Sequence, residues 1–182
     1  ALQNREQTRL EVCAVHTSTG ALSTIRTETD EHWIDLVAGS PTLLADGRLA
    51  MCCERNGVRA LTIDDQVVTS NDIQVRNIIA TTPNAVYFSA NPIADPTVMH
   101  VMRCALSDLS VSSLTDQPGV FTAAVGGDTV VIRSATLNEV RTTTRVNGKH
   151  QIANNAETCL LTPNVTLHRV GANKIATAIV MP

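Results

Sequence analysis

Short apolar stretches alternate with polar breaks along almost the entire chain. Val, Ile and Thr recur in runs of roughly five to seven residues, and turn-forming residues separate these runs at short intervals. We find no long stretch in which apolar residues recur with the 3.6-residue period of a helix. The pattern therefore predicts an all-β chain.

Tight turns are predicted where a residue that tolerates positive φ precedes glycine. Asp46-Gly47, Asn56-Gly57 and Asn147-Gly148 are of this kind, and Thr19-Gly20 is expected to close a further hairpin. Two strands joined by so short a turn run antiparallel. The sequence thus predicts a series of antiparallel hairpins.

Three of these hairpins repeat one layout of strand, short polar break and strand, over residues 47–63, 84–106 and 128–146. Their second strands are predicted to begin near Val58, Val98 and Val140, which are 40 and 42 residues apart. A further strand is predicted before each hairpin (32–37, 73–80 and 119–125), and a short closing strand after each (66–70, 109–117 and 149–153). Units of about four strands and roughly 40–45 residues are typical of propeller blades.

The repeat predicts a partial β-propeller of about three and a half four-stranded antiparallel blades over residues 1–155. Residues 8–28 would supply one hairpin of the incomplete blade. An open stack leaves sheet faces uncovered at its ends, so we expect a larger ring. Residues 156–182 are expected to form a linker and a hairpin (165–182) leading into a following domain. The chain starts at Ala1 without an initiator Met or an apolar leader, which we expect of a piece of a longer polypeptide.

Composition and charge narrow the classes of partner. The 182 residues are 43% hydrophobic and 17% charged, as in ordinary globular proteins. A net charge of −3 provides no basic field for nucleic acid, and apolar runs such as 175–181 are shorter than a membrane span. We expect neither nucleic acid nor a membrane as a partner.

The cysteines favour a reducing compartment, and we expect a cytoplasmic location. Their number is odd and they have no C-x-x-C spacing, so neither a disulfide framework nor a zinc site is indicated. Cys52 and Cys53 should point to opposite faces of a strand and act as small apolar fillers. The complete set is Cys13, Cys52, Cys53, Cys104 and Cys159.

Other side chains were weighed as candidate sites. The histidines are scattered without metal-ligand spacing, so we assign no metal and expect surface or hydrogen-bonded core positions for His16, His32, His100, His150 and His168.

The acidic run of Glu28, Asp30 and Glu31 could attract a substrate ammonium group, but a solvated loop is the preferred interpretation. Trp33 is expected to anchor a blade through a buried ring, with cavity lining as the alternative. Asn164-Val165-Thr166 matches a glycosylation acceptor, which we discount because it matters only after secretion.

Several ordered blocks resemble the C-terminal propeller blades of dipeptidyl peptidase IV-type members of the prolyl oligopeptidase family, especially bacterial ones. The blocks are residues 9–37, 41–49, 84–106 and 165–182. The more specific features within them are Trp33 with Asp35, Asp46-Gly47, Tyr87-Phe88, Asp95-Pro96 and His100. The resemblance covers nearly the whole chain.

The resemblance implies a two-domain serine exopeptidase that releases N-terminal dipeptides with Pro or Ala in the second position. Its propeller would wall and gate the substrate cavity, and an α/β-hydrolase domain downstream would carry the Ser, Asp, His triad. Partners implied are that domain of the same polypeptide, peptide substrates and a homo-oligomer of the parent. No cofactor is implied.

Because the chain departs from the family pattern at the positions that matter for chemistry, we assign no catalytic, substrate-binding, cofactor-binding or metal-binding residue. No G-x-S-x-G nucleophile elbow occurs in residues 1–182. The paired glutamates that bind the substrate amine have no counterpart here. An aromatic-arginine pair of some members falls on Val37 and Ala38. The alternative function is a non-catalytic β-repeat scaffold for protein interactions; a self-contained enzyme is disfavoured because no nucleophile, base and orienter are present as a set.

Overall fold

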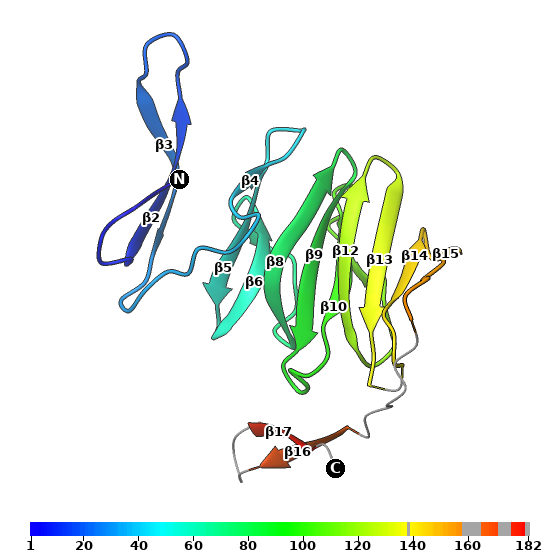
Figure 1. The fold of residues 1–182 in the computed structure, drawn as a ribbon. Helices are drawn as coiled ribbons and strands as arrows, with labels where there is room; N and C mark the ends of the chain where they lie inside the picture. Colours follow the sequence, from blue (N-terminus) through cyan, green and yellow to red (C-terminus); the bar gives the residue numbers. More distant parts are fainter. Residues whose placement is uncertain (138, 158–164, 171–175, 181–182) are drawn as a thin grey trace.

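The strands of the chain form five antiparallel sheets (Figure 1). The computed structural model describes residues 1–137, 139–157, 165–170 and 176–180. Over these residues the regular secondary structure is entirely β, as the hydrophobic pattern predicts. In this described part of the chain, no helix is long and apolar enough to cross a membrane.

The N-terminal sheet has three strands, β1 (Leu2–Gln3), β2 (Arg9–Val15) and β3 (Leu22–Thr29), in that order. The β2–β3 hairpin is the one predicted within residues 8–28, and its turn contains Gly20 at a φ of 71°. The sequence analysis missed β1, because a two-residue strand has no periodicity to detect. Its pairing with β2 is visible only in the tertiary structure.

Three four-stranded sheets follow, each with its strands in sequence order, and we call them the first, second and third blades. The first blade comprises β4 (Thr42–Leu43), β5 (Leu49–Arg55), β6 (Val58–Ile63) and β7 (Gln66–Val67). The second comprises β8 (Ile73–Thr82), β9 (Ala85–Pro92), β10 (His100–Ala105) and β11 (Val111–Ser113). The third comprises β12 (Val120–Gly126), β13 (Thr129–Ala135), β14 (Thr143–Val146) and β15 (His150–Ile152). They stand side by side like successive blades of a propeller (Figure 1).

The predicted strand at 32–37 is wrong, because the first strand of the first blade is β4. The carboxylate of Asp30 accepts hydrogen bonds from the amides of His32 and Trp33, at 2.8 and 3.2 Å, and this turn ends the extended chain. Residues 32–37 instead run as an irregular connection from the N-terminal sheet to the first blade.

The predicted start of the third repeat's second strand near Val140 is also wrong, since β14 begins at Thr143. Val140 is 42% exposed, so burial does not hold it in the sheet. The predicted turns were correct in conformation: Asn56 and Gly57 have φ of 54° and 78°, and Asn147 and Gly148 have 50° and 66°.

The main core lies between the first and second blades. Phe88 and Cys104 of the second blade and Leu61 of the first are fully buried in it. Its buried members are Leu44, Ala50, Leu61, Ile63, Val75, Ile78, Val86, Phe88, Ala90, Cys104 and Leu106. Burial of apolar area on this scale is the dominant stabilising contribution to such a sheet pair.

A smaller core joins the N-terminal sheet to the first blade. Leu10 and Val12 of β2 pack with Leu49, Met51 and Cys53 of β5. The first blade is therefore covered on both faces, which explains the nearly continuous run of buried residues in β6.

The C-terminal hairpin confirms the predicted strand pair within residues 165–182. Its strands are β16 (Thr166–Val170) and β17 (Ala176–Val180), paired antiparallel from Thr166 opposite Val180 to Val170 opposite Ala176. In Figure 1 the hairpin lies beyond the lower ends of the blades, the ends at which β9 terminates. The residues between the two strands, 171–175, lie outside the described part of the chain.

Candidate functional site

The histidines occupy hydrogen-bonded or surface positions, as predicted. The Nδ1 atom of His100 lies 3.0 Å from the Thr115 hydroxyl, and its ring stacks on Phe121 with centroids 5.9 Å apart. His16 contacts the Ser18 hydroxyl at 3.0 Å on the exposed β2–β3 hairpin. Across the described ranges, no three His, Cys, Asp or Glu side chains gather as metal ligands.

The buried cysteines are apolar fillers, as expected. Cys53 is 5% exposed in the smaller core, and Cys52 packs against the main core on the opposite side of the first blade. Burial raises the pKa of the Cys52 thiol to about 12, and burial likewise raises the pKa of Cys53 and Cys104. A thiol that stays protonated near neutral pH is a poor nucleophile. Cys159 lies outside the described residues, and so does Asn164, the first residue of the glycosylation tripeptide.

A small cleft opens between the N-terminal sheet and the first blade. Its accessible volume is about 40 Å³, which suits a few water molecules and is far below the roughly 300 Å³ of a small ligand site. Trp33 lines it with a side chain that is 63% exposed, so the expectation of a buried anchoring ring is wrong. The alternative, that Trp33 lines a substrate cavity, stays a prediction.

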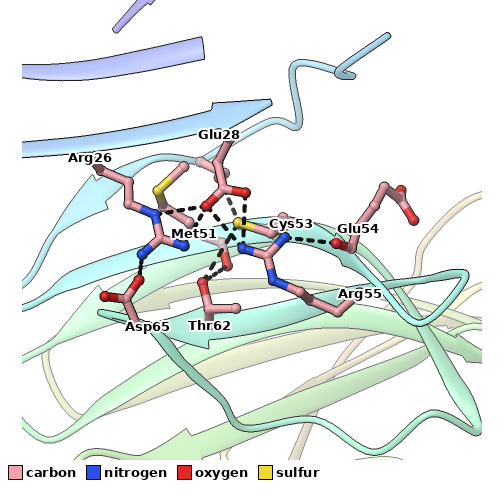
Figure 2. Close-up of polar contacts among 10 residues, drawn as sticks. Arg26, Glu28, Met51, Cys53, Glu54, Arg55, Thr62 and Asp65 are labelled. Atoms are coloured by element: carbon pink, nitrogen blue, oxygen red, sulfur yellow. Dashed lines mark hydrogen bonds and ion pairs between the residues drawn. The ribbon is translucent and has the colours of Figure 1, made fainter. Parts of the chain in front are cut away.

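Glu28 lies at the centre of a charged network beside this cleft (Figure 2). The carboxylate accepts a hydrogen bond from Arg26 Nε at 2.7 Å and from Arg55 Nη2 at 2.9 Å on each oxygen. Arg26 also pairs with Asp65, and Arg55 Nη1 donates to the Glu54 carbonyl at 2.7 Å. The side chain of Glu28 is only 13% exposed, so its interpretation as part of a solvated loop is wrong.

The environment of Glu28 keeps it ionised. Burial by itself would raise the pKa of this carboxyl, but hydrogen bonds from Arg26 and Arg55 and their positive charges outweigh burial and lower the pKa below its ordinary value. With two guanidinium groups already around it, the carboxylate is poorly placed to bind a substrate ammonium group as well.

A second set of ion pairs surrounds Arg59, whose side chain is 15% exposed. Its Nε lies 3.1 Å from Glu54 Oε1, and its Nη2 bonds to Asp35 Oδ2 at 2.5 Å. Asp35 belongs to the irregular connection, so this arginine ties that segment to β6. The ion pairs of Arg59 and those of Glu28 thus line the region between the N-terminal sheet and the first blade. We call this set of charged residues the Glu28 seam: Arg26, Glu28, Asp35, Glu54, Arg55, Arg59 and Asp65.

The remaining residues that carry the family resemblance serve the fold. Phe88 is fully buried, and Asp46 accepts hydrogen bonds from Arg48 Nε and Nη2 at 2.9 and 2.7 Å within its turn. Asp95 accepts a 2.6 Å bond from the Thr97 hydroxyl. Val37, at one of the two positions of the aromatic-arginine pair, is buried.

Comparison with known families identifies a match over most of the chain. The model of the family described as "Dipeptidyl peptidase IV (DPP IV) N-terminal region" matches residues 1–130. This range covers the N-terminal sheet, the first two blades and the beginning of the third. A search of curated proteins found no match.

Proposed function

The chain belongs to the dipeptidyl peptidase IV N-terminal region family, and from this we propose that it forms the last blades of the propeller of a serine exopeptidase. The peptidase would release N-terminal dipeptides with Pro or Ala in the second position. The observation that carries the proposal is the family match over residues 1–130, on a stack of four-stranded antiparallel sheets.

The role of this chain is non-catalytic: it walls and gates the cavity in which a separate domain acts. Two observations support this. Residues 1–182 contain no G-x-S-x-G elbow, and burial holds the thiols of Cys52, Cys53 and Cys104 in their protonated form. The charged side chains of the Glu28 seam form ion pairs with one another, so they stabilise the packing of the sheets and do not take part in catalysis.

We assign residues 1–155 to the propeller and residues 156–182 to the passage into the peptidase domain. Support comes from the pairing pattern: the fourth strand of the third blade ends at Ile152, and β16 pairs with β17 alone. A downstream α/β-hydrolase domain of the same polypeptide is the partner this division implies, with peptides as the substrates of the parent.

The test is a side-by-side assay of this chain and its full-length parent on chromogenic Gly-Pro and Ala-Pro amides. An irreversible serine-hydrolase inhibitor serves as the control. We expect hydrolysis by the parent alone, abolished by the inhibitor. A folded parent without activity would overturn the proposal and favour a scaffold that binds protein partners.

A further inference from the structure

A hollow of about 450 Å³ with a mixed polar and apolar lining lies outside the Glu28 seam, against the second and third blades. Its walls come from β8, the end of β9, the β9–β10 loop and the start of β12. These are the ends of the blades beyond which the C-terminal hairpin lies in Figure 1. The lining residues are Arg76, Asn77, Asn91, Pro96, Thr97, Met99 and Val120.

A β-bulge turns Arg76 toward this hollow. The register of β8 against β9 shifts between Val75, opposite Ala90, and Asn77, opposite Ser89, which leaves Arg76 as the extra residue. In a regular strand neighbouring side chains point to opposite faces, whereas a bulge re-aims one of them. Arg76 and Asn77 therefore line the same hollow, while Val75 stays fully buried in the main core.

Asn91 holds the arginine in place. It is 4% exposed, and its Oδ1 accepts a hydrogen bond from Arg76 Nε. Its Nδ2 donates to the Pro92 carbonyl at 3.1 Å, which fixes the orientation of the amide. Within the described ranges the guanidinium forms this one hydrogen bond and no ion pair, so both Nη groups are available to a ligand.

The residues that line the hollow carry a net positive charge. Arg76 is the one ionisable side chain among its lining residues. Asp95 lies in the β9–β10 loop but does not line the hollow, and its carboxylate accepts hydrogen bonds from the amide and hydroxyl of Thr97 at 3.2 and 2.6 Å. A guanidinium with two free N–H groups in one plane matches a carboxylate in bidentate geometry.

We propose that this hollow binds a carboxylate of a short peptide, with Arg76 as the anchoring cation and Asn91 as the residue that positions it. Asn77 Oδ1 accepts a hydrogen bond from Ser89 and the Thr97 hydroxyl donates to Asp95, which leaves the Nδ2 group of Asn77 as a donor and the Thr97 oxygen as an acceptor for a peptide unit. Met99 and Val120 provide an apolar wall. The identification of the ligand as a peptide rests on the proposed function, whereas the preference for a carboxylate rests on Arg76.

The test measures binding by isothermal titration calorimetry on the intact polypeptide, with acetyl-Ala-Pro-Ala and its C-terminal amide as probes. The acetyl group blocks the amino terminus, so the measurement is independent of dipeptide release. We expect at least a tenfold preference for the free carboxylate. R76Q should abolish this preference, and R133Q, which changes an exposed arginine of β13, should keep it.

A second pair of probes, acetyl-Ala-Pro-Glu-amide and acetyl-Ala-Pro-Gln-amide, distinguishes an acidic side chain from a terminal carboxylate as the source of the group. A preference for either carboxylate that depends on Arg76 supports the proposal. Equal affinity of the wild type for acid and amide in both pairs, or an unchanged preference in R76Q, overturns it. These binding measurements do not depend on whether the parent hydrolyses Ala-Pro amides. The hydrolysis assay therefore tests the proposed function separately.

Discussion

At the scale of single residues, Glu28 shows how a charged side chain on a strand can help to hold two sheets together. Its carboxylate accepts hydrogen bonds from Arg26 of the same strand and from Arg55 of the first blade, and the arginines are in turn held by Asp65 and the Glu54 carbonyl. A half-buried carboxylate satisfied by several charge-assisted hydrogen bonds costs more to remove than an exposed ion pair. The seam therefore contributes to the attachment of the N-terminal sheet.

We expect E28Q to lower the free energy of unfolding by about 2 kcal/mol, because it leaves the half-buried guanidinium of Arg55 without a counter-charge, whereas Arg26 keeps its ion pair with Asp65. Urea denaturation followed by circular dichroism measures the loss. The matched control is E31Q, since Glu31 is exposed and belongs to the same acidic run. Equal stability of E28Q and E31Q would show that the seam contributes nothing.

The lowered pKa of Glu28 predicts a pH dependence with a definite sign. A carboxyl whose pKa is lower in the folded state stabilises the fold above its ordinary pKa of 4.5, and this stabilisation is lost as the pH falls through the folded value. The difference in unfolding free energy between the wild type and E28Q should be constant near neutral pH and shrink below about pH 4.5. A difference that grows on acidification would contradict the assignment.

At the scale of elements, the irregular connection after β3 is held by backbone contacts to strands far away in sequence. The amide of Ile34 donates to the Gln7 carbonyl at 2.6 Å, and the amide of Ile78 donates to the Ala38 carbonyl at 3.0 Å. Gly39 follows directly, with a φ of 77°, and a Cβ atom there would lie far inside van der Waals contact of the Ile78 carbonyl oxygen. The connection thus fits β8 at a position that admits only glycine.

We expect Gly39→Ala to destabilise the protein more than Gly57→Ala, although the two glycines have nearly equal φ. Gly57 has open space around a Cβ position, so its substitution costs only the backbone strain of about 1–2 kcal/mol. Gly39→Ala adds a clash with backbone, which raises the cost by at least about 1 kcal/mol. Thermal or urea unfolding of the two variants measures the difference, and equal losses would mean that the close approach to β8 is unimportant.

At the scale of the whole molecule, packing is uneven from one sheet to the next. The first and second blades share the main core, and the first blade also packs on the N-terminal sheet. In the third blade, among the described residues, Phe121 is the one side chain that is buried rather than partly exposed. The third blade therefore buries less apolar surface than the first and second blades, and we expect its stability to depend on further contacts that cover it.

Amide hydrogen exchange should reveal this gradient. We expect the slowest exchange in β5, β6, β9 and β10, whose residues form the main core, and exchange at least tenfold faster in β14 and β15. Mass spectrometry of peptic peptides from the native chain measures it. Uniform protection across all three blades would show that they unfold as one cooperative unit.

Much of this architecture could be predicted because its signals are local. Asn56-Gly57 and Asn147-Gly148 adopt positive φ with little help from the rest of the chain, and alternation of side chains along a strand follows from backbone geometry. Hairpin order and blade spacing follow from such signals. The family resemblance, which the match over residues 1–130 confirms, rests on the same ordered blocks.

The failed predictions concern features that depend on distant contacts. The exposed Trp33 and the half-buried Glu28 depend on which sheet lies opposite, and no local pattern contains that information. The bulge at Arg76, about which the sequence made no prediction, depends on the register of β8 against β9. The sequence by itself thus determined an all-β chain of repeated hairpins with its turns. Only the tertiary structure decided which charges meet and which side chains face a hollow, because those contacts form between strands that are brought together by packing and not by proximity along the chain.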